Sequence, residues 1–342
     1  MKQRVSVFYT IIASLAMLIL IIDSRTALSG ASSGVILCLT TIIPSLFPFI
    51  VISNILTGLL SVHRITVLRP VGRFLHLPEN TETLLLIGFL GGYPIGAQCI
   101  VQSYRNGNLS RSQAERMLSF CNNAGPSFLF GIGAAVLQKT WPCWILWLIH
   151  ISSALIVGLM TPPESEHHVS MIHSSPISVT DSVNKAIRTM ASICGWVVIF
   201  RTLLIFFQRW IFWIMPDAAK CLISGILELA NGCTSLSSIS SIGLRFQLFS
   251  VMLGFGGLCV ALQTHSVLTG SGLSVRTYFP GKMAQSAVSY LLCVIIQPLL
   301  PETLQHRPNI AAIAISFGIC VCYRVYRQIV KKDYSFPTLV GV

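Results

Sequence analysis

Two stretches of otherwise lipid-like sequence are interrupted by glycine, proline and amide residues, and these interruptions constrain the fold more than any other feature. The first reads GFLGGYPIGAQ (88–98) and is followed by CNNAGPSFLFGIG (121–133). The second reads GILELANGC (225–233) and is followed by LGFGGLCVALQTH (253–265). An unpaired backbone group in hydrocarbon costs several kcal/mol, so a broken helix at membrane depth is tolerated only where it is buried in protein or lines a polar cavity. Paired interruptions in the two halves of a chain are typical of a transporter binding site.

The composition places the chain in a membrane. Of its 342 residues, 53% are hydrophobic and 10% are charged, which is more apolar surface than a soluble domain of this size can bury. The formal net charge is +12, but the cations stand mainly in short loops beside apolar segments, as the orientation bias of membrane proteins requires. We therefore expect a polytopic protein in contact with the lipid bilayer and no nucleic-acid partner.

The first half is expected to contain four membrane-spanning helices and one re-entrant hairpin. The apolar run 5–22 is interpreted as an uncleaved first helix, and a signal peptide cleaved near 27–29 is the alternative. The segment 84–104 has basic loops on both sides, so it should enter and leave on the same face with its tip near 91–96. Ser110 and Gln113 fit a capping box that begins the next helix. The other expected spans are 34–60, kinked at Pro44 and Pro48, 117–137 and 141–160.

The second half is expected to repeat this plan in the opposite orientation. A polar linker, 161–189, separates an N-terminal membrane half, 1–160, from a C-terminal half, 190–342. The expected elements are spans at 190–215, 246–268, 284–300 and 310–326 and a second hairpin at 222–242. The loop with Arg276 and Lys282 is then cytoplasmic, as are both termini. The predicted fold is all-α, with about eight transmembrane helices and two re-entrant hairpins in an inverted repeat.

Glu228 is the carboxylate that we expect inside the membrane. The other acidic residues are expected in loops or at segment ends: Asp23, Glu79, Glu82, Glu115, Glu164, Glu166, Asp181, Asp217, Glu302 and Asp333. An intramembrane carboxylate is a functional residue by default, and Glu228 could bind a cation, accept hydrogen bonds from a hydroxyl-rich solute or take up a proton. The alternative is an ion pair with Arg201, which also lies in an apolar run.

Asn122 and Asn123 are expected to face a cavity, because Pro126 removes a helical hydrogen bond next to them. The alternative is a proline kink whose freed carbonyls are satisfied by these two amides. Gly256 and Gly257 permit either close helix packing or an unwound point. The expected solute-binding residues are Gly92, Tyr93, Pro94, Gly96, Gln98, Asn122, Asn123, Gly125, Pro126, Glu228, Asn231, Gly256, Gly257 and Gln263.

Signatures of enzymes and metal sites are missing from the sequence. It contains no H-E-x-x-H, G-x-x-x-x-G-K-[ST] or G-x-S-x-G motif, and Ser182-x-x-Lys185 is a single short match in the linker. The 11 cysteines lie almost all in apolar segments without paired spacing, so they are interpreted as small buried hydrophobic residues. His150 is interpreted as a satisfied interior histidine. We expect no catalytic residue, no metal and no cofactor.

The run from Gly88 to Gly133 resembles the signature of the YlbJ-type sporulation integral membrane proteins of the nucleoside-recognition (Gate) domain group. The motifs G-x-P-x-G, N-G-x-L-S-x-x-x-A-E and N-N-x-G-P occur there in order, and GILELANGC with GFGGLCVALQTHSVL carries a weaker likeness into the second half. The resemblance implies a protein of the cell (inner) membrane of spore-forming bacteria, with a role in spore cortex formation and a fold related to concentrative nucleoside transporters.

The sequence therefore predicts a solute transporter or permease acting in sporulation, with a midplane site for a small polar solute whose identity stays open. The alternative is a non-transporting assembly protein of the sporulation machinery, in which the same polar residues would pair internally. A homo-oligomer or sporulation membrane partners are compatible with either function. An intramembrane enzyme is a third class, for which only Glu228 and His265 offer a conceivable pair.

Overall fold

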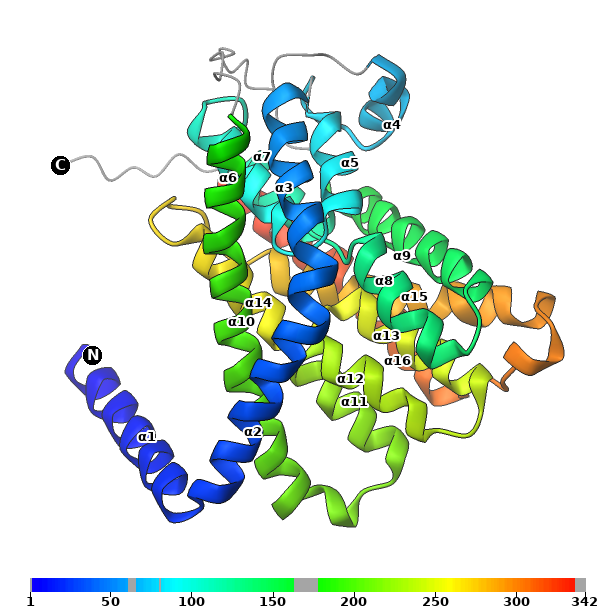
Figure 1. Ribbon diagram of the computed structural model, residues 1–342. Helices are drawn as coiled ribbons and strands as arrows, with labels where there is room; N and C mark the ends of the chain where they lie inside the picture. The colour runs from blue at the N-terminus through cyan, green and yellow to red at the C-terminus, as the bar shows by residue number, and fades with distance from the viewer. Residues whose placement is uncertain (1, 61–65, 80, 163–177, 336–342) are drawn as a thin grey trace.

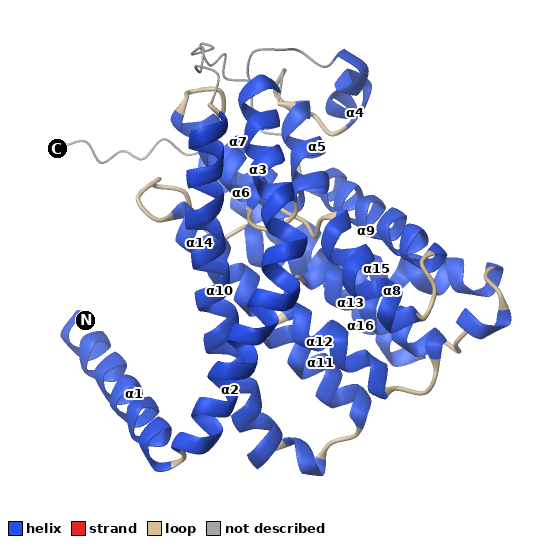
Figure 2. Cartoon of the chain, viewed as in Figure 1, coloured by secondary structure: helices blue, strands red, loops and turns tan. Residues whose placement is uncertain are grey.

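The computed structural model describes residues 2–60, 66–79, 81–162 and 178–335, and every regular element in these residues is helical (Figure 2). The first half consists of α1 (Lys2–Ile22), α2 (Ser24–Leu37), a π-helical turn (Cys38–Ile42), α3 (Ile43–Leu60), a 3₁₀ turn (Thr66–Leu68), α4 (Arg69–Phe74), α5 (Glu82–Gly91), α6 (Ile95–Arg105), α7 (Arg111–Cys121), α8 (Pro126–Leu137) and α9 (Trp141–Met160).

The second half consists of α10 (Val179–Trp210), α11 (Asp217–Leu227), α12 (Leu229–Ser235), α13 (Ile242–Phe255), α14 (Gly257–Leu268), α15 (Tyr278–Ile296) and α16 (Ile310–Ser335). Short 3₁₀ turns follow α10 (Phe212–Ile214), α12 (Leu236–Ser238) and α15 (Gln297–Leu299), and another lies at Glu302–Leu304.

Six helical units in the described residues are long and apolar enough to cross a bilayer. They are Arg111–Leu137, Trp141–Met160, Val179–Trp210, Ile242–Leu268, Tyr278–Leu299 and Ile310–Lys331. A seventh results if α1 and the α2 segment, which meet at a bend of 97°, count as one span. The protein is therefore an all-helical, multi-pass membrane protein, and the expected total of eight spans stays a prediction.

The elements of the two halves follow the same order. Each half has a long helical unit, then two short helices (α5–α6 and α11–α12), then a unit of 27 residues that is broken in the middle, then an unbroken helix; α1, α4 and α16 lie outside this shared order. The long units, α2–α3 and α10, lie side by side along one edge of the molecule (Figure 1), and α9 packs against α15. Each half therefore packs its own elements against their counterparts in the other.

Proline and glycine account for most of the helix breaks. Pro126 occupies the first turn of α8, where the missing N–H costs nothing. The π-helical turn comes directly before Pro44, whose ring would clash with the carbonyl of the residue four positions earlier in a regular helix. Gly256 separates α13 from α14 in the left-handed region, at φ 82°, where a residue without Cβ pays no steric cost.

Three helices begin earlier than the hydropathy pattern predicts, and the expected boundaries are wrong there. The helix α2 begins at Ser24, not at 34, because the Asp23 carboxylate accepts the Thr26 N–H at its N-terminus. The helix α10 begins at Val179, inside the expected linker 161–189, because the Ser178 hydroxyl caps it. The helix α15 begins at Tyr278, so Lys282 is a buried helical residue and not part of a cytoplasmic loop.

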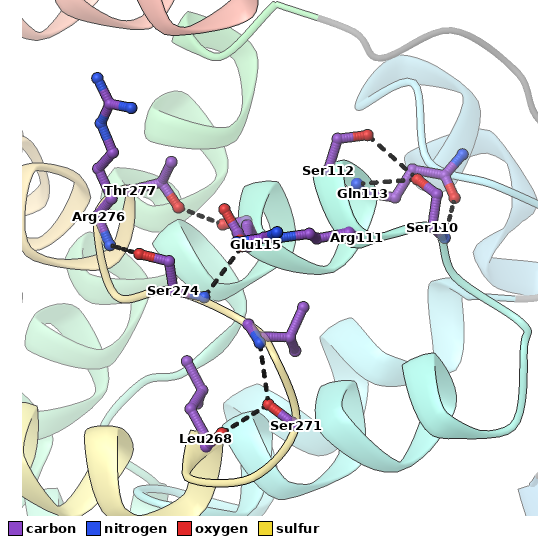
Figure 3. Close-up of polar contacts among 11 residues, drawn as sticks. Ser110, Arg111, Ser112, Gln113, Glu115, Leu268, Ser271, Ser274, Arg276 and Thr277 are labelled. Carbon is purple, nitrogen blue, oxygen red and sulfur yellow. Dashed lines mark hydrogen bonds and ion pairs between the residues drawn. The ribbon is translucent and has the colours of Figure 1, made fainter. Parts of the chain in front are cut away.

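The start of α7 shows how a capped helix holds the loop that precedes α15 (Figure 3). The predicted capping box is confirmed: the Gln113 N–H donates to the Ser110 hydroxyl, and the Ser110 N–H donates to the Gln113 side chain. One turn later, a Glu115 carboxylate oxygen accepts from Arg111, at 2.9 Å, and from the Ser274 N–H, at 3.0 Å. The Glu115 side chain is only 1% exposed. Glu82, the first residue of α5, is also buried, at the segment end where the sequence places it.

Candidate functional site

Four interruptions of the helices meet at one place in the molecule. They are Gly92–Pro94 between α5 and α6, Asn122–Gly125 between α7 and α8, Glu228 between α11 and α12, and Gly256 between α13 and α14. A cavity of about 60 Å³, enough for a few water molecules, lies among them. Residues from the first three breaks line this cavity, and side chains of α3, α8, α10 and α14 complete the wall.

The breaks touch one another mainly through glycine backbone. A Cβ built on Gly92 would lie 3.0 Å from the Gly125 nitrogen, and one on Gly257 would lie 3.0 Å from the Gly225 carbonyl oxygen. A Cβ on Gly256 would lie 2.7 Å from the Tyr93 hydroxyl oxygen. Side chains at these positions would force the elements apart, so the close approach of the four breaks depends on glycine.

Glu228 lines the cavity and also caps α12. One of its carboxylate oxygens accepts from the Ala230 N–H at 2.9 Å, and the other accepts from the Asn231 N–H at 2.7 Å and from the Asn231 side-chain amide at 2.6 Å. The helix begins there because the carboxylate satisfies two otherwise unpaired backbone donors. Glu228 is 4% exposed, and these three hydrogen bonds satisfy its buried carboxylate oxygens.

Arg201 reaches Glu228 through Asn231. The guanidinium donates to the Asn231 side-chain oxygen at 2.6 Å and to the Ser33 hydroxyl at 3.1 Å. No ion pair joins Arg201 directly to Glu228 in the residues that the structure describes. The alternative from the sequence, a pairing of Glu228 with Arg201, is therefore indirect. The Asn231 amide of α12 bonds both side chains, and Arg201 of α10 also bonds Ser33 of α2.

Five of the fourteen expected solute-binding residues line the cavity, namely Gly92, Tyr93, Gly125, Glu228 and Gln263. The other nine expected residues do not line the cavity: Pro94, Gly96, Gln98, Asn122, Asn123, Pro126, Asn231, Gly256 and Gly257. Gln98 donates to the Thr189 hydroxyl of α10 at 2.9 Å, and Gly96 packs against the backbone of Asn122. These residues support the site without forming its surface.

Asn122 and Asn123 do not line this cavity, and their side chains make internal hydrogen bonds, as in the alternative that the sequence offers. The Asn122 amide donates to the Thr264 hydroxyl at 2.9 Å, and its oxygen accepts from the Ala97 N–H. The Asn123 amide donates to the Phe120 carbonyl at 2.7 Å, which is the internal pairing that a broken helix requires. Their neighbours Ala124 and Gly125 line the cavity instead.

A buried polar cluster around Lys282 was not anticipated from the sequence. The Lys282 ammonium nitrogen lies 2.9 Å from the Asn123 side-chain oxygen and 2.7 Å from the Gln285 side-chain oxygen. It also lies 5.5 Å from the ring centroid of Tyr93, within the range of a cation–π contact. Tyr93 therefore lines the cavity and also lies close to Lys282.

His150 completes this cluster from α9. Its Nε2 accepts the Ala124 N–H at 3.1 Å, and Gln285 donates to the Asn123 oxygen at 2.9 Å. His150 is 1% exposed and bonded, as expected of a satisfied interior histidine. The sequence signal that could have revealed the cluster is the spacing of Lys282 and Gln285, three residues apart on one face of an apolar helix.

Fold and site together define the class: an all-helical, multi-pass membrane protein whose broken helices surround a small buried cavity with one carboxylate in its wall. No family model and no solved structure matches the chain. The chain is similar to the sporulation integral membrane protein YlbJ of Bacillus subtilis (strain 168), with 22% identity over 80% of this chain and 78% of the relative. The chain is a homologue of that protein, and the resemblance to the YlbJ type is confirmed.

Proposed function

We propose that the protein is a solute transporter or permease of the cell (inner) membrane that acts in sporulation, with the cavity at the four helix breaks as its site for a small polar solute. The convergence of the breaks carries this proposal, because irregular backbone at membrane depth is typical of binding sites in transporters. The relative's description as a sporulation integral membrane protein supports a membrane role in sporulation.

We further propose that the two halves form an inverted repeat with α5–α6 and α11–α12 as re-entrant hairpins and with both termini in the cytoplasm. The shared order of elements supports the repeat. The short helices support the hairpins, because α5 and α6 have only 10 and 11 residues and pack against each other. About 20 residues are needed to span a bilayer, so neither helix can cross alone.

The charges around the cavity favour a solute with oxygen acceptors. Arg201 donates to the Asn231 amide that bonds Glu228, and Lys282 lies beside the cavity-lining Tyr93 and contacts only neutral groups among its described hydrogen-bond partners. A buried ammonium is stabilised by further acceptors or by negative charge. Carbonyl, hydroxyl or carboxylate oxygens on the solute would provide them.

The experiment is labelling of single cysteines by a small charged thiol reagent in intact membranes, in a background without the 11 native cysteines. Ala124→Cys, Ala230→Cys and Val260→Cys place a thiol in the cavity wall. Ala154→Cys is the matched negative control, because Ala154 is fully buried outside the cavity. Lys139→Cys is the positive control, because Lys139 is exposed and a thiol there should react with any active reagent.

A water-filled transport site predicts labelling at the three wall positions and none at Ala154→Cys. A panel of polar solutes, beginning with nucleosides, should then include one that slows this labelling. If Lys139→Cys reacts while all three wall positions stay unlabelled, water and solutes do not reach the cavity, and the proposal fails.

A second candidate is a non-transporting assembly protein of the sporulation membrane. The internal pairing of Asn122, Asn123 and Asn231 favours it, because an assembly protein needs no polar groups open to a solute. Homo-oligomers or other sporulation membrane proteins would be its partners. This candidate predicts that purified protein in vesicles does not raise the flux of any solute in the panel.

A further inference from the structure

The segment between α3 and α5 presents an apolar ridge to the outside. The 3₁₀ turn Thr66–Leu68 and α4 form one continuous helical segment, hereafter the surface helix. Val67 is 82% exposed, Phe74 is 66% exposed and Val71 is 38% exposed. Positions 67, 71 and 74 follow the spacing of one helix face, so the three side chains form a single ridge.

A second face of the surface helix, beside the ridge, is fixed to the body of the protein. Gly72 packs against the Glu82 side chain, and Leu75 is 1% exposed. The buried Arg116 guanidinium donates to the Leu75 carbonyl at 2.7 Å and to the Gly158 carbonyl at 3.2 Å. The ridge is therefore held in place and is not a feature of a loosely attached loop.

Arg69 and Arg73 lie on the side of the helix that faces away from the ridge. At 100° per residue, Arg69 is about 170° and Arg73 about 130° from the centre of the ridge. Neither guanidinium takes part in an ion pair within the described part of the chain. The surface helix thus combines an exposed apolar face with positive charge and carries no acidic residue.

The composition of the surface helix favours the membrane interface over both bulk water and the hydrocarbon core. It follows the apolar α3 and lies beside the N-terminal end of α5, at one end of the molecule (Figure 1). Its arginines would be costly in the hydrocarbon core, and its apolar ridge would be costly in water. The boundary between lipid headgroups and acyl chains satisfies both, because long cationic side chains can extend to the phosphate level.

We propose that the surface helix is a docking surface for acidic phospholipid headgroups. Val67, Val71 and Phe74 insert among the acyl chains, while Arg69 and Arg73 contact lipid phosphates. Charge complementarity selects acidic over zwitterionic lipids.

The test is the depth of a nitroxide spin label at Phe74→Cys, with His76→Cys as a nearby exposed comparison, in the full chain without native cysteines. Collisions with oxygen report on acyl chains, and collisions with a water-soluble nickel complex report on water. The protein is placed in phosphatidylcholine vesicles with or without phosphatidylglycerol.

The label at 74 should collide with oxygen more than the label at 76, and phosphatidylglycerol should reduce its collisions with nickel. Arg69→Gln together with Arg73→Gln should abolish the effect of phosphatidylglycerol, and 1 M salt should weaken it by screening. The matched pair Lys139→Gln and Arg307→Gln removes two exposed cations elsewhere and should leave the effect intact.

The proposal is overturned if phosphatidylglycerol does not change the label at 74, or if the two glutamine substitutions leave its effect unchanged. The spin label at 74 could instead become less mobile as more protein is added per vesicle, in both lipid compositions. That result would assign the ridge to contact with a second copy of the chain. These outcomes do not depend on whether the protein transports a solute.

Discussion

At the scale of single residues, Lys282 poses the sharpest question. It is 1% exposed and bonded to two neutral side chains, Asn123 and Gln285, in a membrane protein with few buried charges near it. A buried charge of this kind adds little to stability, because an apolar residue of similar volume often serves as well. A role at the adjoining cavity is the better explanation for a lysine at this position.

The substitution Lys282→Met tests that role. We expect the thermal unfolding midpoint in detergent to fall modestly, because the Asn123 oxygen keeps its bond from Gln285 but the buried Gln285 oxygen loses its bond from Lys282. We expect solute uptake by reconstituted vesicles to fall roughly tenfold or more, the cost of losing one charge-assisted hydrogen bond of about 1.5–3 kcal/mol. Full uptake by a stable Lys282→Met protein would show that the ammonium serves packing alone.

Glu228 is predicted to act on stability through the start of α12. Glu228→Ala removes two acceptor oxygens that receive three hydrogen bonds and should lower the free energy of unfolding by about 2 kcal/mol or more, from the lost cap and the unpaired Asn231 amide. Glu228→Gln keeps one oxygen for a backbone N–H and should cost less. Denaturant unfolding in detergent gives both values, and equal losses would contradict the capping role.

The sequence could identify Glu228 but not Lys282, for a physical reason. A carboxylate in the middle of an apolar run stands out in any hydropathy pattern, whereas Lys282 lies four residues after the first residue of its helix, where cations are common. The direction of Asn122 and Asn123 was equally hidden, because side-chain direction at a helix break depends on backbone angles that spacing does not determine.

At the scale of elements, each short helix pair is built around backbone contact. In α11–α12, a Cβ on Gly232 would overlap the Cα and nitrogen of Gly225, so the two helices touch without side chains between them. The same holds where Gly88 and Gly96 meet the Cys121 carbonyl. These contacts bring the tips of the helix pairs to the cavity.

The substitution Gly232→Ala should separate α11 from α12 and lower the free energy of unfolding by about 1–3 kcal/mol, the usual cost of overpacking. Gly318→Ala in α16 is the matched control, because nothing lies within 4 Å of its Cβ position. There the better helix propensity of alanine should raise stability by up to about 1 kcal/mol. Unfolding curves that show the same change for both variants would contradict the packing argument.

The breaks were predictable from the sequence, and several helix starts were not. Glycine and proline act locally, so the interruptions at Gly92, Gly125 and Gly256 follow from residue type. The early starts of α2, α10 and α15 depend on single capping or loop contacts, which hydropathy does not record. Whether the short helices re-enter the membrane depends on the bilayer as well as on the chain.

At the scale of the whole molecule, the two halves share an extensive interface and are not separate domains. The helix α10 of the second half lies along α2 and α3 of the first, and α15 lies along α9. Tyr93 of the first half also rests on Gly256 of the second. Each half alone would expose the surfaces that these contacts cover.

A chain divided between residues 162 and 178 should therefore reassemble. When both pieces are expressed together and one carries an affinity tag, the other should be recovered with it after detergent extraction. Either piece expressed alone should be degraded or should aggregate. Recovery of two stable, separate pieces would contradict an interface of this extent.

The backbone-to-backbone contacts at the four breaks also bear on how such a protein can change during evolution. Because glycine main chain holds the breaks together, few polar side chains, chiefly Glu228, Gln263 and Tyr93, give the cavity its chemical character. A lineage could replace these few residues and acquire a different ligand while the scaffold stayed intact. The backbone that forms the cavity and the side chains that select its ligand can therefore change independently.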